Sequence, residues 1–231
     1  MSVVLQKFIS DAGLCSRRQA ELLIRQGKVK VNGHAAELGM RADAGDIVLV
    51  NGKKISSRGL DHIYIALHKP AGYTCTSREF KNEQNVFSLV KVKERLFVVG
   101  RLDKDSTGLV ILTNDGQWAQ RVTHPKYRHE KEYIVRLATD KKISVNQACT
   151  LVDILQKGVH LADNSVGRAQ AVKYLGDGVF NMILTQGKKR QIREMFASLG
   201  YKVVSLLRTR IGDVLLNDLA EGQWQYISVK K

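Results

Sequence analysis

Short apolar segments that alternate with polar residues, rather than long helical runs, dominate the chain after residue 61. Alternation with a period of two is typical of a strand that buries one face. Helical patterns do not separate these strands regularly, which argues against a doubly wound parallel sheet and favours an α+β fold around a mixed, mainly antiparallel sheet. The predicted strands span residues 63–67, 97–99, 109–113, 132–137, 179–184 and 202–206, and the predicted helices lie near residues 116–123, 142–156 and 190–199.

The stretch Asn51–Leu60 is polar and basic and contains glycines, so it is the best candidate for a domain boundary. Before it come two helical patterns and then two short alternating runs. Each alternating run ends in an Asn-Gly pair, at Asn32-Gly33 and at Asn51-Gly52, which indicates a tight hairpin. The sequence therefore predicts a small domain of two helices and a hairpin sheet over residues 1–60, and a larger domain over residues 61–231.

The chain carries a large excess of positive charge. Its 37 lysines and arginines outnumber its 22 aspartates and glutamates, which gives a formal net charge of +15. A polyanion is the natural partner of such a protein, and nucleic acid is the first candidate. The three cysteines are widely spaced, without a CxxC pair or a histidine cluster, so we expect neither a structural zinc site nor a disulfide framework.

No segment is apolar over the roughly 20 residues that a membrane-spanning helix needs. The amino terminus lacks the basic start and long apolar run of a secretory signal. We therefore expect a cytoplasmic protein without a membrane partner.

Four segments combine glycines, turn residues and charges in a way that packing alone does not require: His68–Gly72, Gly100–Gly108, Lys131–Val135 and Gly187–Phe196. The second segment lies between two apolar strands and carries two carboxylates. Loops held between rigid strands commonly carry catalytic groups. Asp103, Asp105 and Ser106 could equally close a turn through hydrogen bonds from side chain to backbone. The glycine spacing matches neither a P-loop nor a dinucleotide-binding fingerprint.

Two resemblances connect these segments. The runs Cys15–Ala20 and Ile24–Gly33 resemble the S-four RNA-binding module, which holds RNA against its helix pair. The run Gly100–Asp103, followed by Ser106–Gly116, resembles the signature of the pseudouridine synthases that modify ribosomal RNA, in the branch that also carries an S-four module. The other three segments match this family in the expected order, so the combined likeness covers nearly the whole chain.

The family resemblance implies a catalytic set of Asp103, Tyr133 and Arg193, and leaves out Asp105 because it occupies a variable position of the signature. Asp103 would act as a nucleophile on the ribose or base, or as a base on the sugar. The family tyrosine stacks on the target base, whereas alternation alone predicts Tyr133 as a core aromatic. Arg193 matches a basic residue that faces the aspartate and pairs with it. Its helical position alone predicts a solvent-facing charge.

Several cations are expected to contact RNA phosphates, although a solvated charged surface is the alternative. In the first part of the chain they lie on the second helix and the strand after it. The expected RNA-binding residues are Arg17, Arg18, Lys28, Lys30, Lys69, Arg101, Lys188, Lys189 and Arg190. The strongly basic stretch over residues 187–210, including Arg208 and Arg210, is interpreted as the rim that meets RNA.

The resemblance implies an isomerase that converts uridine to pseudouridine in ribosomal RNA. This reaction involves no net oxidation and no donated group, so no cofactor and no metal are expected. Within the family, the likeness is greatest to the large-subunit enzymes of the F type, which favours 23S rRNA; relatives of that type can also modify a tRNA. The alternatives are a 16S rRNA enzyme, a tRNA enzyme and a non-catalytic RNA-binding factor of ribosome assembly. We expect a monomer.

Overall fold

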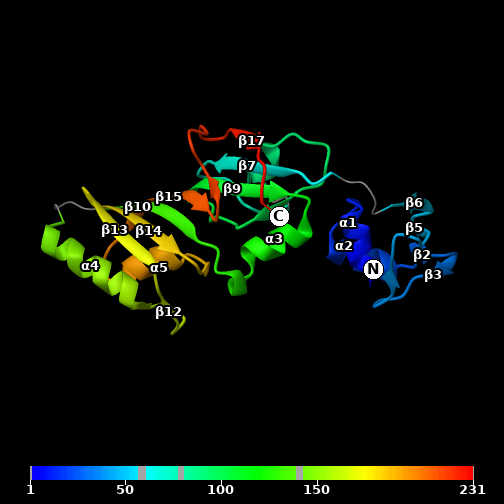
Figure 1. Cartoon of the computed structure of the whole chain (residues 1–231), viewed down its shortest axis with the longest axis horizontal. Coiled ribbons are helices and arrows are strands. Elements are labelled where there is room, and N and C mark those ends of the chain that lie inside the picture. Colours follow the sequence, from blue (N-terminus) through cyan, green and yellow to red (C-terminus); the bar gives the residue numbers. More distant parts are fainter. Residues whose placement is uncertain (1, 57–60, 78–80, 139–142, 231) are drawn as a thin grey trace. The chain divides into compact units, whose positions relative to one another are not determined.

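The computed structural model describes residues 2–56, 61–77, 81–138 and 143–230. The chain divides into two compact units, the first made of residues 1–63, 92–97 and 113–116 and the second of residues 64–91, 98–112 and 117–231. Figure 1 shows the secondary structure of both. The domain boundary predicted at residue 60 falls among residues 57–60, which lie outside the described residues.

The first unit contains a helix pair and a small antiparallel sheet. The sheet has the strand order β3-β2-β5-β6, and β1 pairs with β4 separately. Its elements are β1 (Val3–Val4), α1 (Leu5–Asp11), α2 (Arg17–Arg25), β2 (Val29–Val31), β3 (His34–Ala35), β4 (Arg41–Ala42), β5 (Val48–Val50) and β6 (Lys53–Ile55).

Both predicted Asn-Gly turns are confirmed in this sheet. Asn32-Gly33 joins β2 to β3, and Asn51-Gly52 joins β5 to β6. All four residues have positive φ, as a two-residue hairpin loop of this twist requires. The turns bring the buried valines of β2 and β5 against the helices in one core, which consists of Leu5, Phe8, Ile9, Ala20, Ile24, Val29, Val31, Ala36, Ala42, Val48 and Val50.

Among the described residues after residue 63, the main structure is a nine-stranded sheet. Its main strand order is β13-β14-β10-β15-β9-β7-β17, with β16 beside β15 and β8 beside β9. The elements after residue 63 are β7 (Tyr64–Lys69), η1 (Val86–Ser88), β8 (Phe97–Val99), β9 (Thr107–Thr113), α3 (Gly116–Thr123), η2 (Pro125–Tyr127), β10 (Lys131–Leu137), α4 (Val145–Lys157), β11 (Val159–His160), β12 (Val166–Gly167), β13 (Ala171–Gly176), β14 (Val179–Leu184), α5 (Gln191–Ser198), β15 (Val203–Ile211), β16 (Val214–Leu215) and β17 (Trp224–Tyr226).

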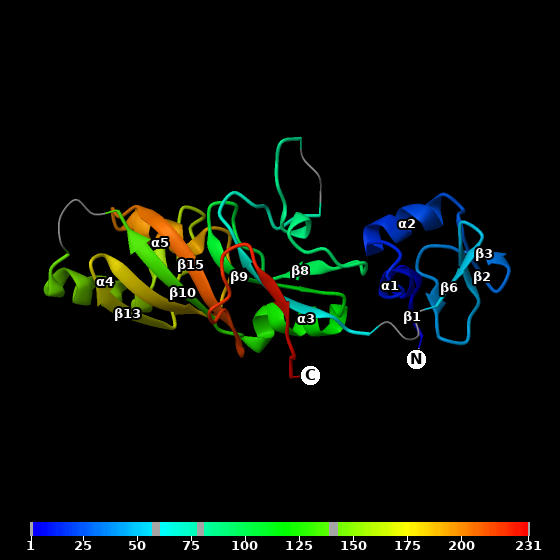
Figure 2. The ribbon, with the colours of Figure 1, turned by 90° about the horizontal axis from the view of Figure 1, so that it is seen from above.

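The sheet is mixed and mainly antiparallel, which confirms the predicted α+β fold. Strand β10 pairs antiparallel with β14 and β15, whereas β9 and β15 run parallel. The helices α4 and α5 pack beside β13 and β15 (Figures 1 and 2). Residue 142, the predicted start of one helix, lies outside the described residues. The sequence patterns missed β13, which is only partly buried, and β17, which is only three residues long.

Two further predictions concern the chain as a whole. All three cysteines are free thiols, and only Cys75 among them is buried. Over the residues that the structure describes, no helix combines the length and the apolar character needed to cross a membrane.

Candidate active site

The loop between β8 and β9 carries the predicted catalytic aspartate. Strand β8 ends at Val99, and Gly100 turns the chain with a φ of 71°. The amide of Ser106 then donates a hydrogen bond of 3.2 Å to the carbonyl of Asp103. A tight turn is therefore present, and a backbone hydrogen bond closes it just before β9 begins at Thr107.

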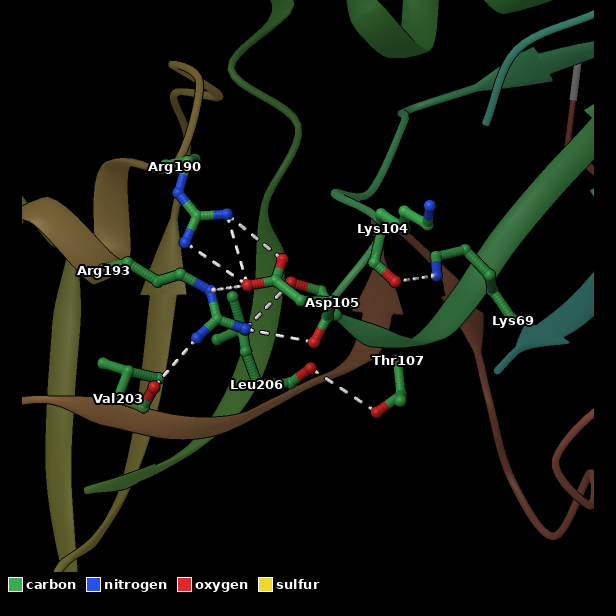
Figure 3. Close-up of polar contacts among 9 residues, drawn as sticks. Lys69, Lys104, Asp105, Thr107, Arg190, Arg193, Val203 and Leu206 are labelled. Carbon is green, nitrogen blue, oxygen red and sulfur yellow. Dashed lines mark hydrogen bonds and ion pairs between the residues drawn. The ribbon is translucent and has the colours of Figure 1, made fainter. Parts of the chain in front are cut away.

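The end of β7 holds this loop from one side. The carbonyl of Lys104 accepts a hydrogen bond of 2.7 Å from the Gly72 amide. It also accepts one of 3.2 Å from the Lys69 ammonium (Figure 3). The same ammonium donates to the Pro70 carbonyl at 2.6 Å. The segment His68–Gly72 thus fixes the position of the loop through its backbone.

The burial of Lys69 corrects the expectation that this residue contacts RNA. Its side chain is fully buried, and its ammonium is directed to backbone carbonyls rather than to the surface. Burial lowers the pKa of Lys69, and the charges of nearby groups, Asp105 and Asp103 among them, oppose this shift. Lys69 therefore lies beneath the loop and supports it through the carbonyls of Pro70 and Lys104.

Arg208 holds the loop at both of its ends. This residue lies on β15 and is 1% exposed. Its Nε donates to the Leu109 carbonyl at 2.8 Å, and its Nη1 donates to the Arg101 carbonyl at 3.4 Å. Its Nη2 donates to the Gly100 carbonyl. One guanidinium therefore connects the entry of the loop with the strand that follows it. The interpretation of Arg208 as part of the RNA-facing rim is wrong for this reason.

Asp103 and Tyr133 line the same hollow, as predicted for residues of one site. We call this space of about 990 Å³ the active-site hollow. Asp103 is partly exposed, and Tyr133 on β10 is 7% exposed. Asp103 is the only aspartate or glutamate among the described residues that line the hollow, and the cations lining it are Arg101, Lys104, Lys131, Lys188, Lys189, Arg190 and Arg208. Such surroundings attract a polyanion.

The arginine predicted to pair with Asp103 pairs with Asp105 instead. The Nε atom of Arg193 lies 3.4 Å from an Oδ2 of Asp105, and Arg190 contacts the same carboxylate at 3.2 Å (Figure 3). Arg193 also donates to the Asp105 carbonyl at 3.2 Å and to the Val203 carbonyl at 2.9 Å. Within the described parts of the chain, the carboxylate of Asp103 forms no ion pair with Arg193.

The turn over residues 103–106 explains this difference. It directs Asp105 toward the start of α5, whereas Asp103 lines the hollow. Arg193 also donates to the hydroxyl of Ser106 at 3.4 Å, so it fixes the position of the loop rather than the Asp103 carboxylate. The sequence analysis excluded Asp105 from the site because its position varies in the signature. A loop also has no helical or strand period that would predict the direction of its side chains.

Glu132 fixes the strand that carries Tyr133. Its carboxylate accepts a hydrogen bond of 2.6 Å from Asn181 on β14 and one of 2.8 Å from Arg210 on β15. These two hydrogen bonds lower the pKa of Glu132. Arg210, which was predicted for the RNA-facing rim, also contacts Glu130 at 3.0 Å and so pairs with two glutamates.

The remaining predicted RNA-binding residues lie at the surface. Arg17, Arg18, Lys28 and Lys30 are exposed in the first unit, and Arg101, Lys188, Lys189 and Arg190 line the active-site hollow of the second. Lys131, which was not among the predicted RNA-binding residues, also lines this hollow. Its burial is the main cause that lowers its pKa, and the nearby positive charge of Arg208 lowers it further. In the described ranges, no cluster of three histidine, cysteine, aspartate or glutamate side chains could hold a metal ion.

Comparison with known proteins gives two matches to protein families and many to individual proteins. Residues 63–198 match the family described as RNA pseudouridylate synthase, and residues 5–48 match the S4 domain. The dual-specificity RNA pseudouridine synthase RluF of Escherichia coli (strain K12) is 40% identical over 225 residues, which cover 97% of this chain and 75% of that protein. The ribosomal large subunit pseudouridine synthase B of Bacillus subtilis (strain 168) is 35% identical over 225 residues, which cover 94% of this chain and 89% of that protein.

A solved structure has the same fold. A crystal structure of pseudouridylate synthase is 32% identical to this chain and superposes with a TM-score of 0.68. The superposition covers 98% of this chain and 96% of that one. The likeness therefore includes both parts of the chain, not the catalytic fold alone.

An S4 domain followed by a mixed sheet with one carboxylate in a basic hollow defines an enzyme that modifies RNA. The chain belongs to the RNA pseudouridylate synthase family. It is an isomerase, and RNA is its substrate. The family resemblance found in the sequence is thereby confirmed.

Proposed function

We propose that the protein converts a specific uridine of 23S ribosomal RNA to pseudouridine, with Asp103 as the catalytic carboxylate. The position of Asp103 carries the proposal, because this carboxylate faces a basic hollow together with Tyr133. Two relatives support the large ribosomal subunit as the source of the RNA. The enzymes from Bacillus subtilis and Vibrio cholerae, 35% and 36% identical, are both named ribosomal large subunit pseudouridine synthase B.

The reaction needs few participants. The bond between N1 and C1′ breaks, the base turns, and a bond between C5 and C1′ forms. One proton leaves C5 and one is gained at N1, so atoms and electrons balance without an oxidant or a donated group. Asp103 would attack the ribose or base as a nucleophile, or remove a proton from the sugar. Both routes require its carboxylate to touch the target nucleotide.

Tyr133 would receive the target base. A base stacked in RNA must leave its stack before its glycosidic bond becomes accessible, and the exposed base then needs an aromatic surface. The position of Tyr133 in the wall of the active-site hollow suits this role. We assign Arg193 and Arg190 a positioning role, because they hold the loop through Asp105 rather than contacting Asp103.

The two parts of the chain would divide the work. Residues 1–60 would form an RNA-binding domain that captures RNA through exposed cations on α2 and β2, and residues 61–231 would form the catalytic domain. Arg101 and the cations at residues 188–190 would contact phosphates around the target. We propose that the enzyme acts as a monomer, and its rRNA substrate would place it in the cytoplasm.

The test combines product mapping with matched variants. The protein is incubated with 23S rRNA, 16S rRNA and tRNA, and new pseudouridines are located. We expect them in 23S rRNA, and product confined to 16S rRNA or tRNA would overturn the substrate assignment. Asp103→Asn should bind RNA but form no pseudouridine. Asp153→Asn makes the same change at an exposed position of α4 and should stay active. Equal activity of both variants would contradict the proposed role of Asp103.

A further inference from the structure

Tyr127 is an exposed aromatic residue whose backbone is held in place. Its side chain is 51% exposed. The short helix η2 begins with Pro125, and the Nδ1 atom of His124 accepts a hydrogen bond from the Lys126 amide at 3.2 Å. The ring of Tyr127 lies next to two imidazoles, with centroid distances of 6.1 Å to His124 and 6.3 Å to His129. A ring carried on a backbone held in this way has fewer conformations to lose when it binds a ligand.

This tyrosine forms part of a second hollow. We call it the side hollow; its volume is about 400 Å³, within the range of about 300–1,000 Å³ typical of small-ligand sites. Its lining residues are Gln117, Gln120, Arg121, His124, Lys126 and Tyr127. His124 lines the active-site hollow as well. The end of α3 and the helix η2 therefore form the wall between the two hollows.

The segment around the side hollow carries positive charge without negative charge. Between Asp115 and Glu130 the sequence contains no acidic residue. Arg121, Lys126 and Arg128 in this interval are all exposed. An exposed aromatic ring beside cations and amide side chains is the chemistry of a site for unpaired RNA, because the ring stacks on a base while the cations contact phosphates.

We infer that the side hollow binds an unpaired nucleobase adjacent to the target nucleotide, with that base stacked on Tyr127. The inference rests on the proposed function, which places the target uridine in the active-site hollow. Because the two hollows share His124, the ligand is the next part of the same RNA strand rather than a separate nucleotide. The cations of the segment would hold the phosphates on either side of the stacked base.

The first experiment measures RNA affinity independently of catalysis. The probe is a fluorescent uridine decanucleotide, titrated with the full chain. Tyr127→Ala and Tyr127→Leu should each weaken binding about tenfold, whereas Tyr127→Phe, which keeps the ring, should bind within twofold of the wild type. The control is Tyr226→Ala, at a tyrosine that is 62% exposed and lines neither hollow. Affinities of Tyr127→Ala and Tyr127→Leu within twofold of the control would overturn the inference.

The second experiment tests stacking directly. In the rRNA fragment that the enzyme modifies, each nucleotide flanking the target is replaced in turn by one that lacks its base. The wild-type protein should lose about tenfold in affinity at one flanking position, and Tyr127→Ala should show no loss there. A loss that persists in Tyr127→Ala would overturn stacking on this ring.

Salt dependence separates the tyrosine from the cations around it. Tyr127→Ala should leave the slope of log Kd against log salt unchanged, whereas Lys126→Ala should reduce it by about 0.7. The decanucleotide experiment does not depend on isomerisation. Failure of the proposed function would appear as missing pseudouridine. Failure of the side-hollow inference would appear as unchanged affinity in Tyr127→Ala and Tyr127→Leu.

Discussion

Replacing Gly108 with alanine should separate the two strands that hold the active-site loop. Gly108 lies on β9 opposite Arg208 on β15, where these strands run parallel. Its φ is 108°, a conformation that residues with a side chain rarely adopt. A Cβ atom at this position would lie 2.3 Å from the Arg208 carbonyl oxygen and 2.5 Å from the Arg208 amide nitrogen. Both are backbone atoms, so no side-chain rotation relieves the overlap.

The size of the effect follows from two contributions. The unfavourable backbone conformation costs about 1–3 kcal/mol, and forcing an extra carbon atom into a packed region adds about 1–3 kcal/mol. Gly176 provides a matched control, since its φ is 96° but no atom would lie within 4 Å of an added Cβ. Gly176→Ala should therefore show only the first contribution. The difference between the two variants measures the overlap at Arg208.

Urea unfolding followed by tryptophan fluorescence measures this difference. Trp118 and Trp224, the two tryptophans of the chain, both belong to the second unit and therefore report on its unfolding. With a slope of about 1–3 kcal/mol per M, the midpoint of Gly108→Ala should lie about 1 M below that of Gly176→Ala. Pseudouridine formation should fall as well, because Arg208 carries the loop. Equal midpoints and equal activities for the two variants would refute the reasoning.

Three other predictions concern single contacts. In Arg208→Lys, the single ammonium cannot reach all three carbonyls that the guanidinium contacts. The rate at saturating RNA should therefore fall about 10- to 100-fold with little change in RNA affinity. A raised KM at unchanged kcat would contradict this positioning role. Because folding lowers the pKa of Glu132, its contribution to the free energy of unfolding is full above its ordinary pKa of 4.5 and is lost as the pH falls through the lowered value. As the pH is lowered, the measured free energy of unfolding should therefore fall less steeply for Glu132→Gln than for the wild type. The double variant Arg17→Ala, Arg18→Ala should reduce the salt dependence of rRNA binding by a slope of about 1 to 2, and an unchanged slope would remove both residues from the RNA interface.

Local rules of sequence predicted much of the fold. The two Asn-Gly turns, the strand over residues 179–184 and the helix over residues 116–123 lie where their patterns indicate them. These elements are decided by alternation, helical spacing or turn chemistry within a few residues. The four charged segments also identified the family. Their match depends only on their residues and their order along the chain, and not on which side chains are in contact in the fold.

The partners of the site residues could not be predicted in the same way. Asp103 and Asp105 are two residues apart in a turn, where no period determines which side chain faces Arg193. Lys69 was misassigned because a basic residue at a strand end ordinarily faces solvent, whereas β7 is buried along nearly its whole length. The burial of Arg208 did have a signal. Strand β15 continues to Ile211, and alternation beyond the predicted end places Arg208 on the face of buried Leu206.

The active-site loop is held in place by hydrogen bonds to its backbone, so its side chains are free to change as such an enzyme diversifies. The carbonyl oxygens of Gly100, Arg101, Lys104 and Leu109 receive the anchoring hydrogen bonds, while the side chains of Arg101 and Lys104 are exposed. Every amino acid has a backbone carbonyl, so replacing the exposed side chains of Arg101 and Lys104 leaves these hydrogen bonds intact. Descendants of one ancestral gene could therefore acquire new RNA targets through such replacements while inheriting the chemistry unaltered.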